Sequence, residues 1–330
     1  MTTNSDFIDR VLAVIAETER DGLLTDHRSR GLSGISGLKT VGLLQRLQRV
    51  AYPNDGSACY LEIGVFQGLT LVSAALEAPS IPCIGVDNFR ILDPGGENLS
   101  IVNERIATFA TTNALLLNMD FEAALETLDA RTGGRKVAVY FIDGPHDYRS
   151  QLVCLLLAKK HLHERAVIVI DDANYADVRF ATRDFLLSHP QFKMIFEAYT
   201  ADHPANMDEA TKRDAERGWL NGVNVLVTDP DNRLPSMLPH VPADRTLYYN
   251  EWLVHRLRLA ELAPEALMLA EAVVYRNGAK EGLARQMLEA RYEKEGARFD
   301  QRHEDRNVDS GGLTLGRINS VRKDRDHEIQ

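Results

Sequence analysis

Residues 58–78 read ACYLEIGVFQGLTLVSAALEA, which is an apolar run of strand length, a turn with two glycines and a helical pattern. The same succession recurs through the middle of the chain. The apolar runs lie at 58–63, 82–86, 114–119, 137–142 and 166–170, followed by two later runs at 193–198 and 223–228. Near-continuous apolar runs are typical of parallel strands covered by helices on both faces. Strands that alternate with helices form right-handed crossovers, so the sequence predicts an α/β fold with a doubly wound, Rossmann-like sheet.

The flanks of this region differ from it in composition and pattern. We expect an N-terminal helical cap with a glycine loop over 1–55, a core over 56–230 and a C-terminal helical extension over 231–298. Residues 299–330 are polar and predict a weakly ordered tail. The added helices exceed what the sheet needs, and we interpret them as a homo-oligomer interface or an active-site cover.

Composition excludes several classes of protein. The 330 residues are 44% hydrophobic and 26% charged, with a net charge of −10, which disfavours a nucleic-acid-binding surface. No run approaches the roughly 18 apolar residues of a membrane span, and the first residues lack a signal-peptide pattern. Cys59, Cys83 and Cys154 each lie in an apolar run, so we expect three buried thiols and a cytoplasmic protein.

Acidic residues stand at the ends of the first three strands. Glu62 precedes the turn that contains Gly64 and Gly68, Asp87 ends the second strand, and Asp120 follows the third. A carboxylate after the second strand can accept both hydroxyls of a ribose. Asp120 can accept a hydrogen bond from an exocyclic amine or cap the next helix, and the cap is the simpler interpretation. Asp87 has a similar structural alternative as a turn cap.

This framework resembles the cofactor site of class I S-adenosylmethionine-dependent methyltransferases. The resemblance covers residues 56–230 and implies a seven-stranded sheet whose last strand is antiparallel. It implies that the glycine loop borders the methionine part of the cofactor, that Asp87 holds the ribose and that Asp120 approaches the adenine. A nicotinamide-binding fold would prefer G-x-G-x-x-G, and Phe66 stands where the middle glycine would be.

Three more carboxylates follow the next two strands. Asp143 comes after the fourth apolar run, and Asp171 and Asp172 come after the fifth. These strands are neighbours in a doubly wound sheet, so we expect their ends to lie side by side. Like charges at that distance repel, and a hard cation such as Mg²⁺ would relieve the repulsion through oxygen ligands. The alternative is that individual acids cap helices or pair with a basic residue such as Arg149 or Lys160.

The string IDGPHDY at 142–148 resembles the I-D-G-x-H-x-Y signature of a bacterial branch of metal-dependent O-methyltransferases. That branch includes enzymes that act on macrolide sugars, and its histidine, a proposed base, matches His146. The catechol-type enzymes have an acid and an amide after the fifth strand, whereas Asp172 here adds a carboxylate. The resemblance implies that Asp143 is both catalytic and a metal ligand, together with Asp171 and Asp172.

The chemistry of methyl transfer fits these residue types. An alcohol needs help to lose its proton, and a neutral imidazole can collect that proton near pH 7. His146 is predicted at a helix start, where the helix dipole disfavours its charged form. The alternative is that His146 only hydrogen-bonds the loop backbone. For the substrate we expect contacts from the loop at 31–40, from Asn174 and Tyr175, and from 199–222, which is a lid with Trp219 or a plain helical excursion. His203 is expected at the surface.

We therefore predict a cytoplasmic S-adenosylmethionine-dependent methyltransferase, assisted by Mg²⁺, that modifies a hydroxyl of a small molecule such as a sugar or secondary metabolite. One alternative is a metal-independent N- or O-methyltransferase, and another is a nucleoside-binding module without catalysis. No nucleic-acid or membrane partner is expected. An NAD-dependent oxidoreductase is disfavoured by the glycine loop.

Overall fold

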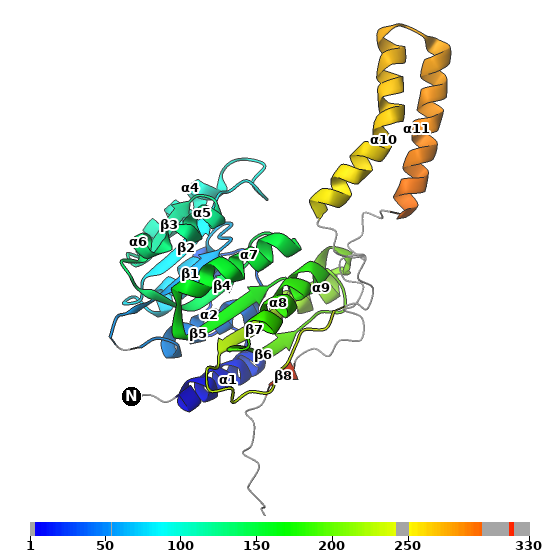
Figure 1. Ribbon diagram of the computed structural model, residues 1–330. Helices are drawn as coiled ribbons and strands as arrows, with labels where there is room; N and C mark the ends of the chain where they lie inside the picture. The colour runs from blue at the N-terminus through cyan, green and yellow to red at the C-terminus, as the bar shows by residue number, and fades with distance from the viewer. Residues whose placement is uncertain (1–3, 54, 242–250, 299–316, 320–330) are drawn as a thin grey trace, which may run out of the picture.

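The computed structural model describes residues 4–53, 55–241, 251–298 and 317–319. A single eight-stranded sheet with the order β3-β2-β1-β4-β5-β7-β6-β8 crosses the molecule (Figure 1). The strands are β1 (Ala58–Ile63), β2 (Cys83–Asp87), β3 (Ala114–Asn118), β4 (Lys136–Ile142), β5 (Leu162–Asp171), β6 (Phe192–Ala198), β7 (Val223–Thr228) and β8 (Arg317–Ile318). Strands β1 to β5 are mutually parallel, as predicted.

The antiparallel end of the sheet contains one strand more than expected. β7 lies between β5 and β6 and runs antiparallel to both, which confirms the predicted last strand of the core. The two-residue β8 pairs with the free edge of β6, so the sheet has eight strands where seven were predicted. β8 falls within the segment expected to be a polar tail. The rest of that segment, 299–316 and 320–330, lies outside the described residues.

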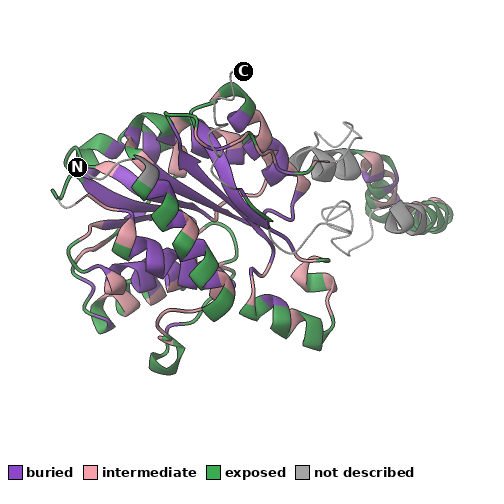
Figure 2. Ribbon diagram, turned by 90° about the horizontal axis from the view of Figure 1, so that it is seen from below, coloured by how far each residue is buried: buried purple, intermediate pink, exposed green. Residues whose placement is uncertain are grey.

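Helices cover both faces of the sheet. They are α1 (Asn4–Asp21), α2 (Leu38–Val50), α3 (Leu69–Glu77), α4 (Asn98–Thr108), α5 (Phe121–Glu126), α6 (Leu128–Thr132), α7 (Tyr148–Ala158), α8 (Ala176–Ser188), α9 (Glu209–Arg217), α10 (Glu251–Val274) and α11 (Gly278–Arg298). One apolar cluster joins α1, α2 and α3 to the sheet, and a second joins α5 to α8 to the opposite face. Figure 2 shows the strands buried between these layers.

Successive residues of a strand point to opposite faces, and β1 shows the consequence. Tyr60 belongs to the cluster beneath α1 to α3, whereas Cys59 and Leu61 belong to the cluster beneath α5 to α8. Both faces are apolar, which explains why the strand has no polar alternation. Cys59, Cys83 and Cys154 are free and buried, as expected.

The N-terminal helices pack directly on the sheet. Phe7 in α1 and Leu43 in α2 are fully buried members of the same cluster as the central strands. Trp219 also lies in this cluster, and its Nε1 donates a hydrogen bond to Glu19 Oε1 at 2.6 Å. Trp219 is therefore a core residue, and the segment 199–222 contains α9.

The C-terminal extension is a pair of long helices. α10 and α11 pack against each other as an antiparallel hairpin that extends away from the sheet (Figure 1). The predicted use of the added helices as an oligomer interface stays a prediction. Within the described part of the chain, no helix has both the length and the apolar character of a membrane span.

Candidate active site

A cavity of about 750 Å³ opens at the carboxyl ends of the parallel strands. Its wall comes from the segments that follow β1, β2, β3, β4 and β5, with Ile35 added from the loop before α2. Doubly wound sheets bind their ligands at this edge, next to the point where the strand order reverses between β1 and β4. Of the predicted site residues, the wall contains Gly64, Asp87, Asp120, Asp143, His146 and Asp172. Glu62, Gly68 and Asp171 do not line it.

The turn after β1 requires its glycines. Gly64 has a φ of 88°, and a Cβ at this position would lie 1.9 Å from the carbonyl oxygen of Asp143. The Gly64 N–H donates to the Val86 carbonyl at 2.9 Å, which ties the turn to β2. Gly68, with a φ of 82°, is the residue before α3. Gly64 is therefore needed for close approach of two backbones, and the approach also fixes the position of Asp143.

Glu62 is fully buried beneath this turn. Its carboxylate accepts hydrogen bonds from the hydroxyls of Tyr60 at 2.6 Å and Thr70 at 2.7 Å. Burial raises the pKa of Glu62 to about 8, although the two hydrogen bonds oppose the shift. In this structure Glu62 anchors α3 to β1, and a direct contact with a cofactor stays a prediction.

Asp87 organises the loops on both sides of it. Its Oδ2 accepts hydrogen bonds from the backbone N–H groups of Val65 and Phe66, both at 2.9 Å. Its Oδ1 accepts one from the Phe89 N–H at 2.8 Å. The side chain thus joins the end of β2 to the glycine turn while it faces the cavity. This is the structural role considered for Asp87, and the ribose contact stays a prediction.

Asp120 lies in the cavity wall and precedes α5. Its Oδ1 accepts a hydrogen bond from the backbone N–H of Glu122 at 2.9 Å, so it caps the helix. The cap interpretation of Asp120 is therefore confirmed. Because Asp120 also faces the cavity, the predicted adenine contact is geometrically available and stays a prediction.

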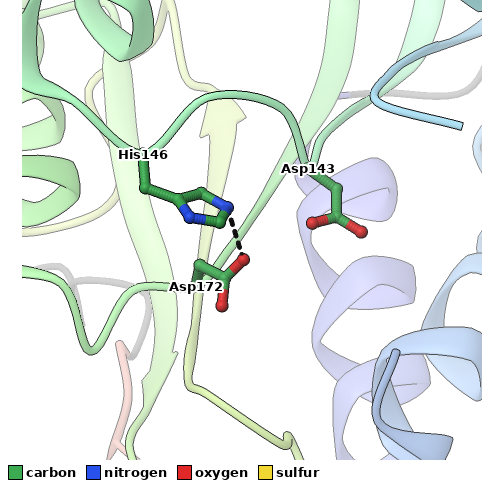
Figure 3. Close-up of side chains that lie close together, drawn as sticks. All are labelled: Asp143, His146 and Asp172. Atoms are coloured by element: carbon green, nitrogen blue, oxygen red, sulfur yellow. Dashed lines mark ion pairs between the residues drawn. The ribbon is translucent and has the colours of Figure 1, made fainter. Parts of the chain in front are cut away.

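Asp143, His146 and Asp172 form the polar end of the cavity (Figure 3). Asp143 directly follows β4 and Asp172 directly follows β5, and these strands are neighbours, as predicted. His146 Nε2 lies 2.6 Å from Asp172 Oδ2. One ligand atom from each of the three residues lies within 4.8 Å of the other two. His146 stands one residue before Asp147, whose side chain caps α7.

The carboxylates here repel one another. Burial, followed by the charges of Asp171 and Asp172, raises the pKa of Asp143 well above its ordinary value. Burial and the charge of Asp172 raise the pKa of Asp171, whose buried Oδ1 accepts no hydrogen bond. Burial acts in the same direction on Asp172, but His146 and Asn221 outweigh it and lower the pKa. The cluster holds more negative charge than its surroundings compensate.

Apart from His146, which pairs with Asp172, no basic side chain among the described lining residues faces this cluster. Arg149 pairs with Glu122 at 2.6 Å, so the alternative in which it pairs with one of the strand-end acids is wrong. None of the described residues that line the cavity is a lysine or an arginine.

Tyr175 and His203 form a layer behind His146. The Tyr175 and His146 rings stack with their centroids 4.8 Å apart, and Tyr175 Oη lies 2.7 Å from His203 Nε2. The Ala205 N–H donates to His203 Nδ1 at 3.1 Å, so in neutral His203 the proton is on Nε2, which donates to Tyr175. His203 is half-buried, and beyond the surface position expected for it, its ring contacts Tyr175.

Asn221 was not identified from the sequence. It is buried two residues before β7, and its Nδ2 donates to Asp172 Oδ1 at 2.6 Å. Asp172 has a φ of 55°, a left-handed conformation that is uncommon for a non-glycine residue. Asn221 and His146 together fix both oxygens of this strained aspartate.

Comparison with known proteins identifies the class of the core. Residues 61–173 match a family model described as "Methyltransferase domain". This part of the chain is a methyltransferase domain. The methyltransferase class predicted from the strand-end acids is thereby confirmed, whereas the finer I-D-G-x-H-x-Y branch stays a prediction.

Solved structures with a similar fold include O-methyltransferases. One from Bacillus cereus in complex with SAH is 13% identical over 69% of this chain and 93% of its own, with a TM-score of 0.45. TomG from Streptomyces achromogenes, involved in tomaymycin synthesis and solved with SAM, is 16% identical over 67% and 90%, also with a TM-score of 0.45. At these values neither likeness carries an argument about substrate. Among curated proteins, none matches the sequence significantly.

Proposed function

We propose that this methyltransferase transfers a methyl group from S-adenosylmethionine to a hydroxyl of a small molecule, with Mg²⁺ as a cofactor. The observation that carries the proposal is the meeting of Asp143, His146 and Asp172 at one end of a cavity bordered by the glycine turn. The cavity is of the size that small-molecule sites have, roughly 300–1,000 Å³. We place the enzyme in the cytoplasm, since its three cysteines are free thiols.

The cofactor contacts follow from the wall of the cavity. Gly64 lets the turn approach a ligand closely, and Asp87 and Asp120 offer carboxylate oxygens toward a ribose and an adenine amine. Asp87 already accepts three backbone hydrogen bonds, and a carboxylate has about four lone-pair sites, so one is left for a ribose hydroxyl. S-Adenosylmethionine supplies the methyl group on its sulfonium when it is bound.

The residues at the polar end fit a hard cation. Asp143 and Asp172 offer oxygen ligands, and Asp171 places a further buried carboxylate behind them with an unsatisfied oxygen. A bound Mg²⁺ would offset the repulsion that raises the pKa of Asp143, and when bound it acts as a Lewis acid toward an oxygen. We propose that Asp143, Asp171 and Asp172 are the carboxylates of this Mg²⁺ site.

His146 is the proposed general base. Its imidazole lies in the cavity wall and is oriented by Asp172 on one side and by the Tyr175 ring on its face. In the transfer, the hydroxyl oxygen forms a bond to the methyl carbon, the bond from carbon to sulfur breaks with its electrons going to sulfur, and the hydroxyl proton goes to His146. The carboxylate of Asp172 favours the imidazolium that results.

Two other functions use the same geometry. In a metal-independent methyltransferase the acids would orient an amine or hydroxyl directly, and chelation would leave turnover unchanged. In a non-catalytic nucleoside-binding module the cavity would bind the cofactor without transfer to any acceptor. The stacking of His146 and its ion pair favour the catalytic proposal, because a binding module has no need of an oriented base.

Calorimetric titration tests the proposal directly. S-Adenosylmethionine is titrated into the protein after EDTA treatment and again with Mg²⁺, and Mg²⁺ is titrated by itself. We expect saturable binding of both, and loss of Mg²⁺ binding in Asp143→Ala with cofactor affinity retained. Asp147→Ser is the matched control, because it removes a carboxylate from the same cavity and keeps a residue that can cap α7.

The outcomes separate the alternatives. Cofactor binding with no response to Mg²⁺ removes the cation and keeps the methyltransferase. Equal loss of Mg²⁺ binding in Asp143→Ala and Asp147→Ser removes Asp143 as a specific ligand. Absence of cofactor binding contradicts the proposed function as a whole.

A further inference from the structure

The wall of the cavity has a strongly one-sided charge. Five aspartates line it, and among the described lining residues there is no lysine or arginine. Four of the five carboxylates accept hydrogen bonds from backbone or amide N–H groups, which hold them in place without removing their charge. The four are Asp87, Asp120, Asp147 and Asp172, and Asp172 also pairs with His146.

The proposed ligands do not reverse this charge. A divalent cation and the single net positive charge of S-adenosylmethionine together offset three of the five carboxylates. The remainder is negative, and a cleft with low-dielectric walls focuses such a field on whatever enters. An acceptor that carried a phosphate or a carboxylate into the cavity would meet this residual negative charge, with no lysine or arginine among the described lining residues to pair with.

The mouth of the cavity is apolar and exposed. Ile35, Ile91 and Leu92 line it, with exposed fractions of 57%, 66% and 63%. They come from two loops far apart in sequence, one before α2 and one after β2. Single exposed aliphatic residues are ordinary, but several gathered at the opening of a cavity are typical of a ligand-binding surface.

Both loops are held in this arrangement. The Arg105 guanidinium donates to the carbonyls of Ser33 at 2.7 Å and Gln67 at 2.6 Å, which ties the loop of Ile35 to the glycine turn. Leu92 has a φ of 57°, and its carbonyl accepts a hydrogen bond from Asn98 Nδ2 at 3.1 Å. A branched residue keeps a left-handed conformation only where its surroundings impose it, and such strain gathers at ligand clamps.

We infer that the methyl acceptor is a neutral or cationic molecule whose hydroxyl enters the acidic end while an apolar body rests on Ile35, Ile91 and Leu92. Acceptors that bring a phosphate or carboxylate into the cavity are disfavoured. This substrate class rests on the proposed function, because the hydroxyl is defined by the methyl-transfer site.

Three probes with the same diol and different charge test the inference. They are 4-tert-butylcatechol, which is neutral, dopamine, which is a cation, and 3,4-dihydroxybenzoate, which is an anion. Binding is measured by saturation-transfer NMR titration on protein loaded with Mg²⁺ and S-adenosylhomocysteine. We expect the neutral and cationic probes to bind, and the anionic probe to bind about tenfold or more weakly, since like-charge contact costs several kcal/mol.

Variants test the apolar surface and the charge of the cavity wall separately. Ile35→Ser and Ile91→Ser should weaken the binding of 4-tert-butylcatechol and leave the binding of unsubstituted catechol unchanged. Leu187→Ser is the matched control, because Leu187 is 59% exposed on α8 and does not line the cavity. Asn88→Lys adds a cation to the wall and should reduce the discrimination against the anionic probe.

Each outcome decides a separate point. Equal or tighter binding of the anionic probe, binding of none of the probes, or equal effects of Ile91→Ser and Leu187→Ser overturns the inferred acceptor class. The calorimetric titration of S-adenosylmethionine is read independently of these probes. If the cofactor binds and the charge order is absent, the inference fails and the proposed function stands.

Discussion

Gly64 and Gly31 provide a matched pair of substitutions that isolates the contact behind the active site. Both glycines have a φ of 88°, but nothing lies within 4 Å of a Cβ at Gly31, whereas a Cβ at Gly64 would lie 1.9 Å from the Asp143 carbonyl oxygen. Gly→Ala at either position imposes the same backbone penalty, about 1–2 kcal/mol for a left-handed alanine. It also gives a similar reduction in unfolded-state entropy. Only Gly64→Ala adds a steric conflict with the backbone of Asp143, directly after β4.

The prediction therefore concerns the difference in free energy of unfolding between the two variants. Forced overpacking costs about 1–3 kcal/mol, so Gly64→Ala should lose more free energy of unfolding than Gly31→Ala by about that amount. The assay is urea denaturation of both variants and the wild type, with the slopes compared to verify that the unfolded states match. In addition, Gly64→Ala should weaken Mg²⁺ binding, because relief of the conflict moves Asp143. Equal losses of stability in the two variants would refute the close-approach argument.

Three further predictions concern the titratable and hydrogen-bonding groups. Glu62 keeps its proton up to about pH 8 when folded and releases it near 4.5 when unfolded, so the folded chain holds more protons between these values. The free energy of unfolding should thus fall as pH rises through this window, by at most about 1.4 kcal/mol per unit, and urea titrations of Glu62→Gln should show a flatter profile. Asn221→Ala should lower Mg²⁺ affinity by about 10–100-fold in calorimetry, because Asp172 loses its orienting donor, with cofactor affinity unchanged. His146→Ala should lower kcat by about 10²–10⁴-fold at constant cofactor affinity, and a normal rate would leave it a loop residue.

The strand-end acids could be placed from the sequence because topology alone brings them together. Parallel strands in a doubly wound sheet present their carboxyl ends at one edge, so Asp143 and Asp172 meet once β4 and β5 are known to be neighbours. Which direction each side chain takes does not follow from that rule. The sequence pattern does not distinguish Asp171 from Asp172, yet only Asp172 lines the cavity. Asp172 leaves the strand in a left-handed conformation, while Asp171 still pairs with Val223.

Other residues depend on contacts that apolar runs do not encode. His203 reaches the site through Tyr175, and its role depends on a turn after β6 whose geometry is set by the Ala205 N–H. Strand β8 consists of two exposed residues and carries no apolar pattern. A polar segment of this kind is therefore predicted to be a tail. In both cases tertiary packing decides what local sequence leaves open.

Asn221 owes its position to the register between β5 and β7. The apolar run at 223–228 predicts a strand antiparallel to its neighbour, but the run alone does not give the register. In the structure Asp171 pairs with Val223, and the pairing continues past the strand ends through the hydrogen bond from Ala173 N–H to the Gly222 carbonyl. Since antiparallel partners run in opposite directions, this register sets the residues just before β7 against those just after β5. Asn221 must then lie beside Asp172, to whose Oδ1 its Nδ2 donates.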